Sequence, residues 1–297
     1  MMDFPELQER VRSVTRHIPF RAGATLLNAV LATFAQKGHP PTWRVSEGVA
    51  DYPAMELDVS SPLQRRLFYF PRAYWERLMR LPFGRFLSST LQEGQVFLDI
   101  GAGLGFYSLY AARRVGPTGR VYSFETDPMK YESLLRSMRR NGFRWTRCIN
   151  AALSDREGTI PIPAVPDGTV HSLVPEADRR AKRRAPQVPV RVTRVDDLDR
   201  EGIFDVPTID LVKIDVEGEE PHTVTGMLKT LERFHLPMVW AEVHGPLDRA
   251  RAANTYPRVE RELRNLGYTP LQWRNGALRE VRTHDIRGKE DVLFRYG

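Results

Sequence analysis

One stretch decides the fold of this 297-residue chain: Leu98-Asp99-Ile100-Gly101-Ala102-Gly103-Leu104-Gly105-Phe106-Tyr107. The apolar run 96–100 predicts a buried strand, and glycines at alternate positions predict a sharp turn before a helix that begins near Phe106. Such a turn lets the backbone approach a ligand closely, and the helix N-terminus presents unpaired N–H groups. In a nicotinamide-binding turn the third glycine follows the second by three positions. Phe106 occupies that position here, so the dinucleotide fingerprint is absent.

Strands and helices alternate along the chain after this turn. Predicted strands cover 96–100, 120–125, 146–151, 209–215 and 237–242, and predicted helices cover 106–114, 129–140, 221–234 and 250–266. Hairpins are expected around 159–165 and between 268–273 and 291–296. Strands separated by helices favour a parallel sheet with crossover connections. We therefore expect a doubly wound α/β fold with a mostly parallel, seven-stranded, Rossmann-like sheet.

The ends of the second and third predicted strands carry residues suited to an adenosine ligand. Glu125 ends the second strand, twenty residues after Gly105, and a carboxylate there can accept hydrogen bonds from both ribose hydroxyls. After the third strand, Ala152 is small enough for a flat ring to approach, and Ser154 or Asp155 could contact its exocyclic amine. A Ser-Asp pair is also common in turns.

Two neighbouring strands end in charged residues. Alternation along the fourth strand puts Lys213, Asp215 and Glu217 on one side, and the fifth strand ends with Glu242 and His244. Buried charges are unfavourable unless they have partners or a task, and ligands of open α/β sheets bind at the carboxyl ends of the strands. These residues therefore predict a polar crevice. The alternative is a structural ion-pair cluster around Lys213.

The order of these pieces resembles the FkbM family of methyltransferases over residues 95 to 245, most specifically in Val212-Lys213-Ile214-Asp215-Val216-Glu217-Gly218. The resemblance implies a class I fold, S-adenosylmethionine as cofactor, and O-methylation of a hydroxyl on a sugar, glycan or natural product. It implies that Asp99 places the cofactor's amino group and that Gly101, Gly103 and Gly105 accommodate its methionine portion. Two departures are Gly103, where Asn is usual, and Thr126, where Pro usually follows the ribose-binding Glu.

Methyl transfer to a hydroxyl needs a group that withdraws the proton. Asp215 is the first candidate, as a base or as a group that orients the acceptor, and Glu242 and His244 are further candidates. Asp215 and Glu242 could instead hold Mg²⁺ through their carboxylate oxygens. The sequence leaves these options open.

Two segments lie outside the recognisable motifs. Residues 1–93 predict a helical extension whose aromatic-rich part, 63–91, packs against the methyltransferase domain of residues 94–297. A basic insertion is expected at about 156–205, with seven Lys and Arg residues between 179 and 194. The extension does not reveal the acceptor.

The net charge of +7 suggests anionic partners, such as a phosphorylated acceptor, nucleic acid or a membrane surface that the protein touches peripherally. The basic stretch lacks interleaved aromatic residues, so a small-molecule or glycan acceptor is favoured over nucleic acid. An RNA ribose methyltransferase and a catalytically inactive cofactor-binding protein remain the alternatives. No apolar run approaches the ~20 residues that span a bilayer, and the start of the chain lacks a secretory pattern. Because Cys148 is also the only cysteine, we expect a cytoplasmic protein, and its oligomeric state stays open.

Overall fold

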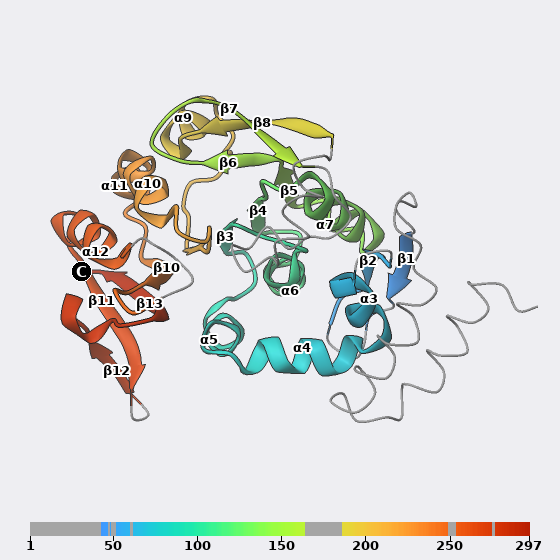
Figure 1. Ribbon diagram of the computed structural model, residues 1–297, viewed down its shortest axis with the longest axis horizontal. Coiled ribbons are helices and arrows are strands. Elements are labelled where there is room, and N and C mark those ends of the chain that lie inside the picture. The colour runs from blue at the N-terminus through green and yellow to red at the C-terminus, as the bar shows by residue number, and fades with distance from the viewer. Residues whose placement is uncertain are drawn as a thin grey trace, which may run out of the picture.

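The computed structural model describes residues 43–46, 48, 52–59, 62–163, 186–248, 254–274 and 277–297. Its centre is an eight-stranded sheet in the order β12-β11-β13-β10-β9-β3-β4-β5 (Figure 1). The strands are β3 (Val96–Ile100), β4 (Arg120–Phe124), β5 (Thr146–Ile149), β9 (Leu211–Ile214), β10 (Met238–His244), β11 (Tyr268–Arg274), β12 (Ala277–Glu280) and β13 (Lys289–Tyr296). Strands β5, β4, β3, β9 and β10 run parallel, and β13, β11 and β12 pair antiparallel. The mostly parallel sheet is confirmed, with β12 as one strand more than predicted.

The order of the strands reverses at β3. Strands β4 and β5 extend the sheet on one side of β3, and β9 and β10 extend it on the other. The register places Asp99 beside Lys213, and Lys213 in turn beside Trp240. The turns that leave the carboxyl ends of β3 and β9 therefore diverge, which opens a crevice of the kind that binds ligands in α/β sheets.

Helices cover both faces of the sheet (Figure 1). One layer contains α3 (Pro62–Tyr69), α4 (Pro71–Arg80), α5 (Pro82–Thr90), α6 (Phe106–Val115) and α7 (Pro128–Arg140). The other contains α9 (Val195–Arg200), α10 (Glu220–Thr225), α11 (Leu228–Phe234) and α12 (Tyr256–Asn265). Phe97 packs with the first layer and Leu98 with the second, because neighbouring strand residues point to opposite faces.

The described part of the N-terminal extension contains strands as well as helices. Strands β1 (Trp43–Ser46) and β2 (Met55–Asp58) form an antiparallel pair ahead of α3, α4 and α5. The aromatic residues pack inward, with the Trp75 ring centroid 4.9 Å from Phe106 and that of Phe83 5.3 Å from Trp240. This segment thus shares one hydrophobic core with the sheet. Residues 1–42 lie outside the described residues.

The insertion between β5 and β9 carries a second sheet, of β6 (Ala151–Leu153), β8 (Gln187–Thr193) and β7 (Gly158–Pro163). Of the hairpin predicted around 159–165, the described part is β7, which pairs antiparallel with β8; residues 164 and 165 lie outside the described residues. The single helix predicted over 221–234 is divided into α10 and α11 near Gly226, where a Cβ would lie 2.0 Å from the Ser154 carbonyl oxygen. None of the helices in the described segments is long and apolar enough to cross a bilayer.

Candidate active site

The glycine turn joins β3 to α6, and its three glycines have different roles. All three have positive φ, of 80° at Gly101, 60° at Gly103 and 87° at Gly105. A Cβ on Gly101 would lie 1.9 Å from the Asp215 carbonyl oxygen, and one on Gly105 would lie 2.3 Å from Leu134. A Cβ on Gly103 would meet no atom within 4 Å among the described residues. Two glycines therefore serve internal packing, whereas the third faces open space.

Alanine substitutions are expected to separate these roles. Gly101→Ala should lower the free energy of unfolding by about 3 kcal/mol or more, because backbone atoms block the new Cβ and φ is positive. Gly103→Ala should lower it by only about 1–2 kcal/mol, the strain of the backbone alone. Chemical denaturation of both variants measures this, and equal losses would contradict the assignment.

A cavity of about 330 Å³ lies beside this turn, at the carboxyl ends of the central strands. Four of the predicted site residues line it, namely Gly101, Gly103, Glu125 and Asp215. Tyr74, Phe106 and Tyr107 add aromatic surface to its wall. A largely apolar hollow with a few converging polar groups is the usual form of a small-molecule site.

Glu125 is held on the cavity wall by the backbone. Its Oε2 accepts a hydrogen bond from the Gly103 N–H at 2.7 Å, and its Oε1 accepts one from the Asp127 N–H at 2.8 Å. Burial raises the pKa of Glu125, and the charge of Lys130 and these two hydrogen bonds oppose the rise. Each carboxylate oxygen has a second lone pair. Glu125 therefore ties the turn to β4 and can still accept hydrogen bonds from a ligand.

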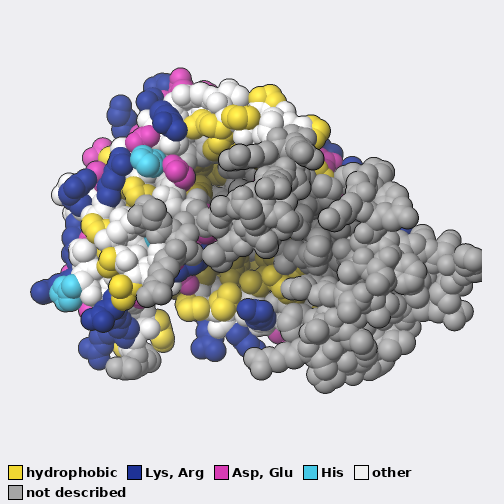
Figure 2. Space-filling model, viewed as in Figure 1, with side chains coloured by type: hydrophobic (Ala, Val, Ile, Leu, Met, Phe, Trp, Pro, Cys, Tyr) yellow, Lys and Arg dark blue, Asp and Glu magenta, His cyan; other side chains and the backbone are white. Residues whose placement is uncertain are grey.

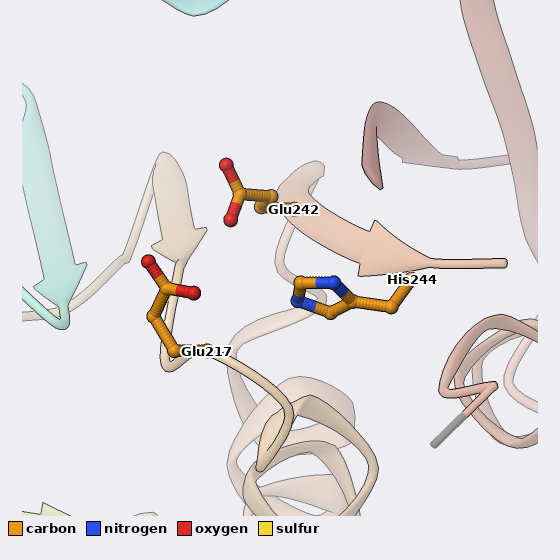
Figure 3. A group of neighbouring side chains, drawn as sticks. All are labelled: Glu217, Glu242 and His244. Carbon is orange, nitrogen blue, oxygen red and sulfur yellow. The ribbon is translucent and has the colours of Figure 1, made fainter. Parts of the chain in front are cut away.

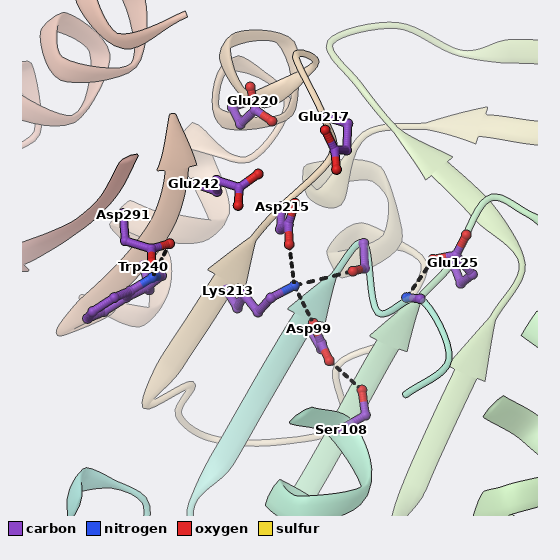
Figure 4. Close-up of polar contacts among 12 residues, drawn as sticks. Asp99, Ser108, Glu125, Lys213, Asp215, Glu217, Glu220, Trp240, Glu242 and Asp291 are labelled. Atoms are coloured by element: carbon purple, nitrogen blue, oxygen red, sulfur yellow. Dashed lines mark hydrogen bonds and ion pairs between the residues drawn. The ribbon is translucent and has the colours of Figure 1, made fainter. Parts of the chain in front are cut away.

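Lys213 and Asp99 form a buried ion pair beneath the turn (Figure 4). The Lys213 Nζ lies 3.2 Å from Asp99 Oδ1 and also donates to the Gly101 carbonyl oxygen at 3.2 Å. The other oxygen of Asp99 accepts a 2.6 Å hydrogen bond from the Ser108 hydroxyl. Burial by itself would lower the pKa of Lys213, but the Asp99 and Asp215 carboxylates outweigh it and raise the pKa. Asp99 does not line the cavity and supports the turn from below.

The three predicted catalytic residues lie on adjacent strands. Asp215 follows β9, with its Oδ2 3.6 Å from Lys213 Nζ. Glu242 and His244 belong to β10, and Glu242 faces Asp215 and Glu217 (Figure 4). Burial and the Asp215 charge raise the pKa of Glu242 to about 8, although Lys289 opposes this. His244 is fully buried, and its Nδ1 lies 2.6 Å from Asp248 Oδ2. The structure thus places the three residues on neighbouring strands, but only Asp215 among them lines the cavity.

The residues predicted to meet the adenine lie away from this cavity. Ala152, Ser154 and Asp155 are not among its lining residues. Ala152 pairs with β8 in the small sheet, the Ser154 carbonyl packs against Gly226, and Asp155 Oδ2 lies 3.4 Å from Arg258. These contacts tie the segment to β8, α10 and α12.

Sequence reasoning missed two residues of the site. Asp127 lines the cavity and caps α7 through Oδ1, and its buried Oδ2 has no hydrogen-bond partner in the described segments. The Asp127-Pro128 pair signalled the cap but not the second oxygen. Lys289 reaches the site from β13, with Nζ 2.5 Å from Glu242 Oε1. Nothing in the local sequence around Lys289 indicates this contact, since it arises from strand pairing.

The fold and this site place the chain in the class I S-adenosylmethionine-dependent methyltransferases. The model of the methyltransferase FkbM domain matches residues 99–270, which is more than half of the chain. The chain therefore belongs to the methyltransferase FkbM family, as its motifs indicated.

Individual relatives are distant. The protein-L-isoaspartate O-methyltransferase of Methanothrix thermoacetophila is 29% identical over 117 residues, which cover 34% of this chain and 56% of that protein. The O-methyltransferase from Bacillus cereus, in complex with SAH, aligns with a TM-score of 0.42 and 10% identity over 79% of this chain and 96% of that one. Fibrillarin from Aeropyrum pernix, with bound S-adenosylmethionine, aligns with a TM-score of 0.36 and 14% identity over 69% and 66% of the two chains.

Proposed function

We propose that this enzyme transfers a methyl group from S-adenosylmethionine to a hydroxyl of a sugar, glycan or natural-product acceptor. The observation that carries the proposal is the position of Asp215. It lines the cavity, its backbone packs against Gly101 of the glycine turn, and its carboxylate faces the charged residues of β10 (Figure 4). A proton acceptor therefore lies between the cofactor turn and a polar crevice.

The cavity residues fit the cofactor. Gly103 leaves room for its methionine portion, and Glu125 can accept hydrogen bonds from the ribose hydroxyls. Asp127 Oδ2, buried and without a partner in the described part of the chain, suits an N–H donor such as the exocyclic amine of adenine. Asp99 and Gly105 act by shaping the turn. This assignment does not include Ala152, Ser154 and Asp155, because they do not line the cavity.

The chain's own residues can activate the acceptor. A neutral hydroxyl is a weak nucleophile, so its proton must be withdrawn as the oxygen attacks. When bound, the cofactor supplies an electrophilic methyl group, whose bond to sulfur breaks with its electron pair as the new carbon–oxygen bond forms. Asp215 takes the hydroxyl proton or orients the hydroxyl, and the Lys213 ammonium lies 3.6 Å from its Oδ2. Glu242 and His244 lie on the neighbouring strand β10 but do not line this cavity, and His244 is fully buried.

Glu125→Gln tests the ribose contact. We expect the affinity for S-adenosylmethionine to fall roughly 10–100-fold, because charge-assisted hydrogen bonds to the hydroxyls are lost. Isothermal titration calorimetry measures the affinity, and thermal denaturation shows whether the variant is folded. Glu132→Gln is the matched control, since that carboxylate pairs with Arg136 on α7 and does not line the cavity. Unchanged affinity in the folded Glu125→Gln variant would exclude this role.

The function itself is tested with cofactor and acceptor separately. The purified protein should bind both S-adenosylmethionine and its demethylated product. It should also transfer labelled methyl groups to a hydroxylated metabolite or glycan from an extract of a strain that lacks the gene. Mass spectrometry should find the same compound lacking one methylene mass in that strain. If the protein binds neither S-adenosylmethionine nor its demethylated product, the proposal is wrong. Cofactor binding without methyl transfer to any acceptor would indicate a catalytically inactive cofactor-binding protein.

Pairing of the basic residues supports a small acceptor over RNA. Arg191 pairs with Glu201 at 2.6 Å, and the guanidinium of Arg194 contacts the Asp155 carbonyl at 2.7 Å and Asp197 at 3.4 Å. On the face shown in Figure 2, Lys and Arg side chains are spread over α9, α11, α12 and β12, with acidic side chains among them. Residues 179–184 of the basic stretch lie outside the described residues. RNA binding that weakens steeply with salt would favour the ribose methyltransferase instead.

A further inference from the structure

Three metal-ligating side chains converge at the carboxyl ends of β9 and β10. Glu217, Glu242 and His244 bring one ligand atom each to within 4.8 Å of one another (Figure 3). Glu242 and His244 are two residues apart on β10, so they point to the same side of the sheet. Glu217 follows β9 and has a φ of 57°, a conformation that disfavours side chains and places this carboxylate opposite β10.

His244 provides the observation that points to a ligand. Its imidazole is fully buried, and Nδ1 is held by Asp248 Oδ2 at 2.6 Å. With Nδ1–H donated to Asp248, Nε2 carries a lone pair, and Figure 3 shows it directed toward Glu217. Nε2 has no hydrogen-bond partner in the described segments, and Glu220 Oε1 lies 3.9 Å from it. A histidine anchored through one nitrogen to a carboxylate, with the other nitrogen bare, is the usual arrangement of a metal ligand.

A lysine ammonium now occupies part of this site. Lys289 is the register partner of His244 on β13. Its Nζ lies 2.5 Å from Glu242 Oε1 and 3.4 Å from Glu217 Oε1. The two carboxylates therefore already enclose one cationic group. A lysine on a flexible stem can withdraw when a more highly charged ion competes for the same oxygens.

We propose that Glu217, Glu242 and His244 bind one divalent transition-metal ion in place of the Lys289 ammonium. One imidazole nitrogen with two carboxylates suits Mn²⁺ and its first-row neighbours better than Mg²⁺, which prefers oxygen ligands alone. This differs from the Mg²⁺ site considered between Asp215 and Glu242. Three protein ligands leave coordination positions open. We assign the open coordination positions to the acceptor hydroxyl and to a second oxygen beside it, as in a vicinal diol or a hydroxy acid. This assignment rests on the proposed function.

Metal binding can be tested without cofactor or acceptor, so its outcome is independent of the proposed function. The probe is Mn²⁺ added to the metal-free protein, followed by calorimetry and by the electron paramagnetic resonance of free Mn²⁺. We expect one ion per chain and at least tenfold weaker binding of Mg²⁺. His244→Ala and Glu242→Gln should each weaken Mn²⁺ binding at least tenfold, and Asp248→Asn roughly 10–100-fold. His222→Ala is the control, because that partly exposed histidine pairs with Glu219 on the surface.

Lys289→Ala distinguishes a metal site from a structural ion-pair cluster. If the ammonium competes with the metal, this substitution should tighten Mn²⁺ binding several-fold. If Lys289 is only structural, the substitution should lower the stability of the fold and leave Mn²⁺ binding no tighter. In the wild-type protein, Mn²⁺ should broaden the ring signals of His244 in NMR spectra far more strongly than those of His235, which lies near Tyr296 beyond the opposite end of β10. This comparison requires no variant to fold. Absence of stoichiometric Mn²⁺ binding by both the wild type and Lys289→Ala would overturn the proposal, as would broadening of both histidines alike.

Discussion

Lys213→Met is expected to lower the free energy of unfolding by about 3–5 kcal/mol, the usual loss when one partner of a buried ion pair is removed. Lys213 and Asp99 are almost completely buried, and their atoms lie 3.2 Å apart. Methionine fills the space of the lysine stem but leaves the Asp99 carboxylate without its cation and the Gly101 carbonyl without its donor. Urea denaturation at neutral pH measures the loss.

The double variant Asp99→Asn/Lys213→Met is the control for this prediction. It removes both charges, so the uncompensated carboxylate is gone and much of the lost stability should return. Asn can still accept the hydrogen bond from Ser108. A single variant that loses less than about 1 kcal/mol, or a double variant less stable than the single one, would show that the pair does not hold the turn.

Asp215→Asn is expected to lower the rate of methyl transfer about 10²–10⁴-fold, the contribution typical of a positioned general base. Asparagine keeps the shape of the side chain but cannot take up the acceptor's proton. Affinity for S-adenosylmethionine should change little, because Glu125 and Gly103 carry the proposed cofactor contacts. Labelled methyl transfer and calorimetry on the same preparation separate the two effects.

The control for Asp215→Asn is Asp205→Asn. It also removes one carboxylate charge, but from a residue that accepts a hydrogen bond from Tyr122 and does not line the cavity. Wild-type turnover in folded Asp215→Asn would remove Asp215 from the chemistry. Its role would then be limited to neutralising Lys213, and that role should appear only as lower stability.

Features of the protein that depend on local chemistry can be predicted from the order of its residues. Alternating glycines between an apolar strand and a helix predicted the turn, and Asp127-Pro128 predicted the start of α7, where Asp127 Oδ1 accepts hydrogen bonds from two backbone N–H groups. Strand–helix alternation predicted the parallel sheet. Glu125 and Asp215 could be predicted as site residues because each lies at the end of a predicted strand. Steric limits and unpaired N–H groups act over a few residues, so the residue order reveals them.

The side chains that meet in the site are set by the pairing of strands and the packing of helices. Asp99 turned out to support the turn from below, because β9 pairs with β3 and brings Lys213 beside it. Lys289 enters the site because β13 pairs antiparallel with β10, and the Ser154 carbonyl packs against Gly226 at the end of α10. These contacts join residues far apart in the chain, and strand register and close packing set them rather than any local pattern. The sequence therefore indicated the family and the crevice. The pairing of β13 with β10, which places Lys289 beside Glu242, became visible only in the fold, and the proposed metal site rests on it.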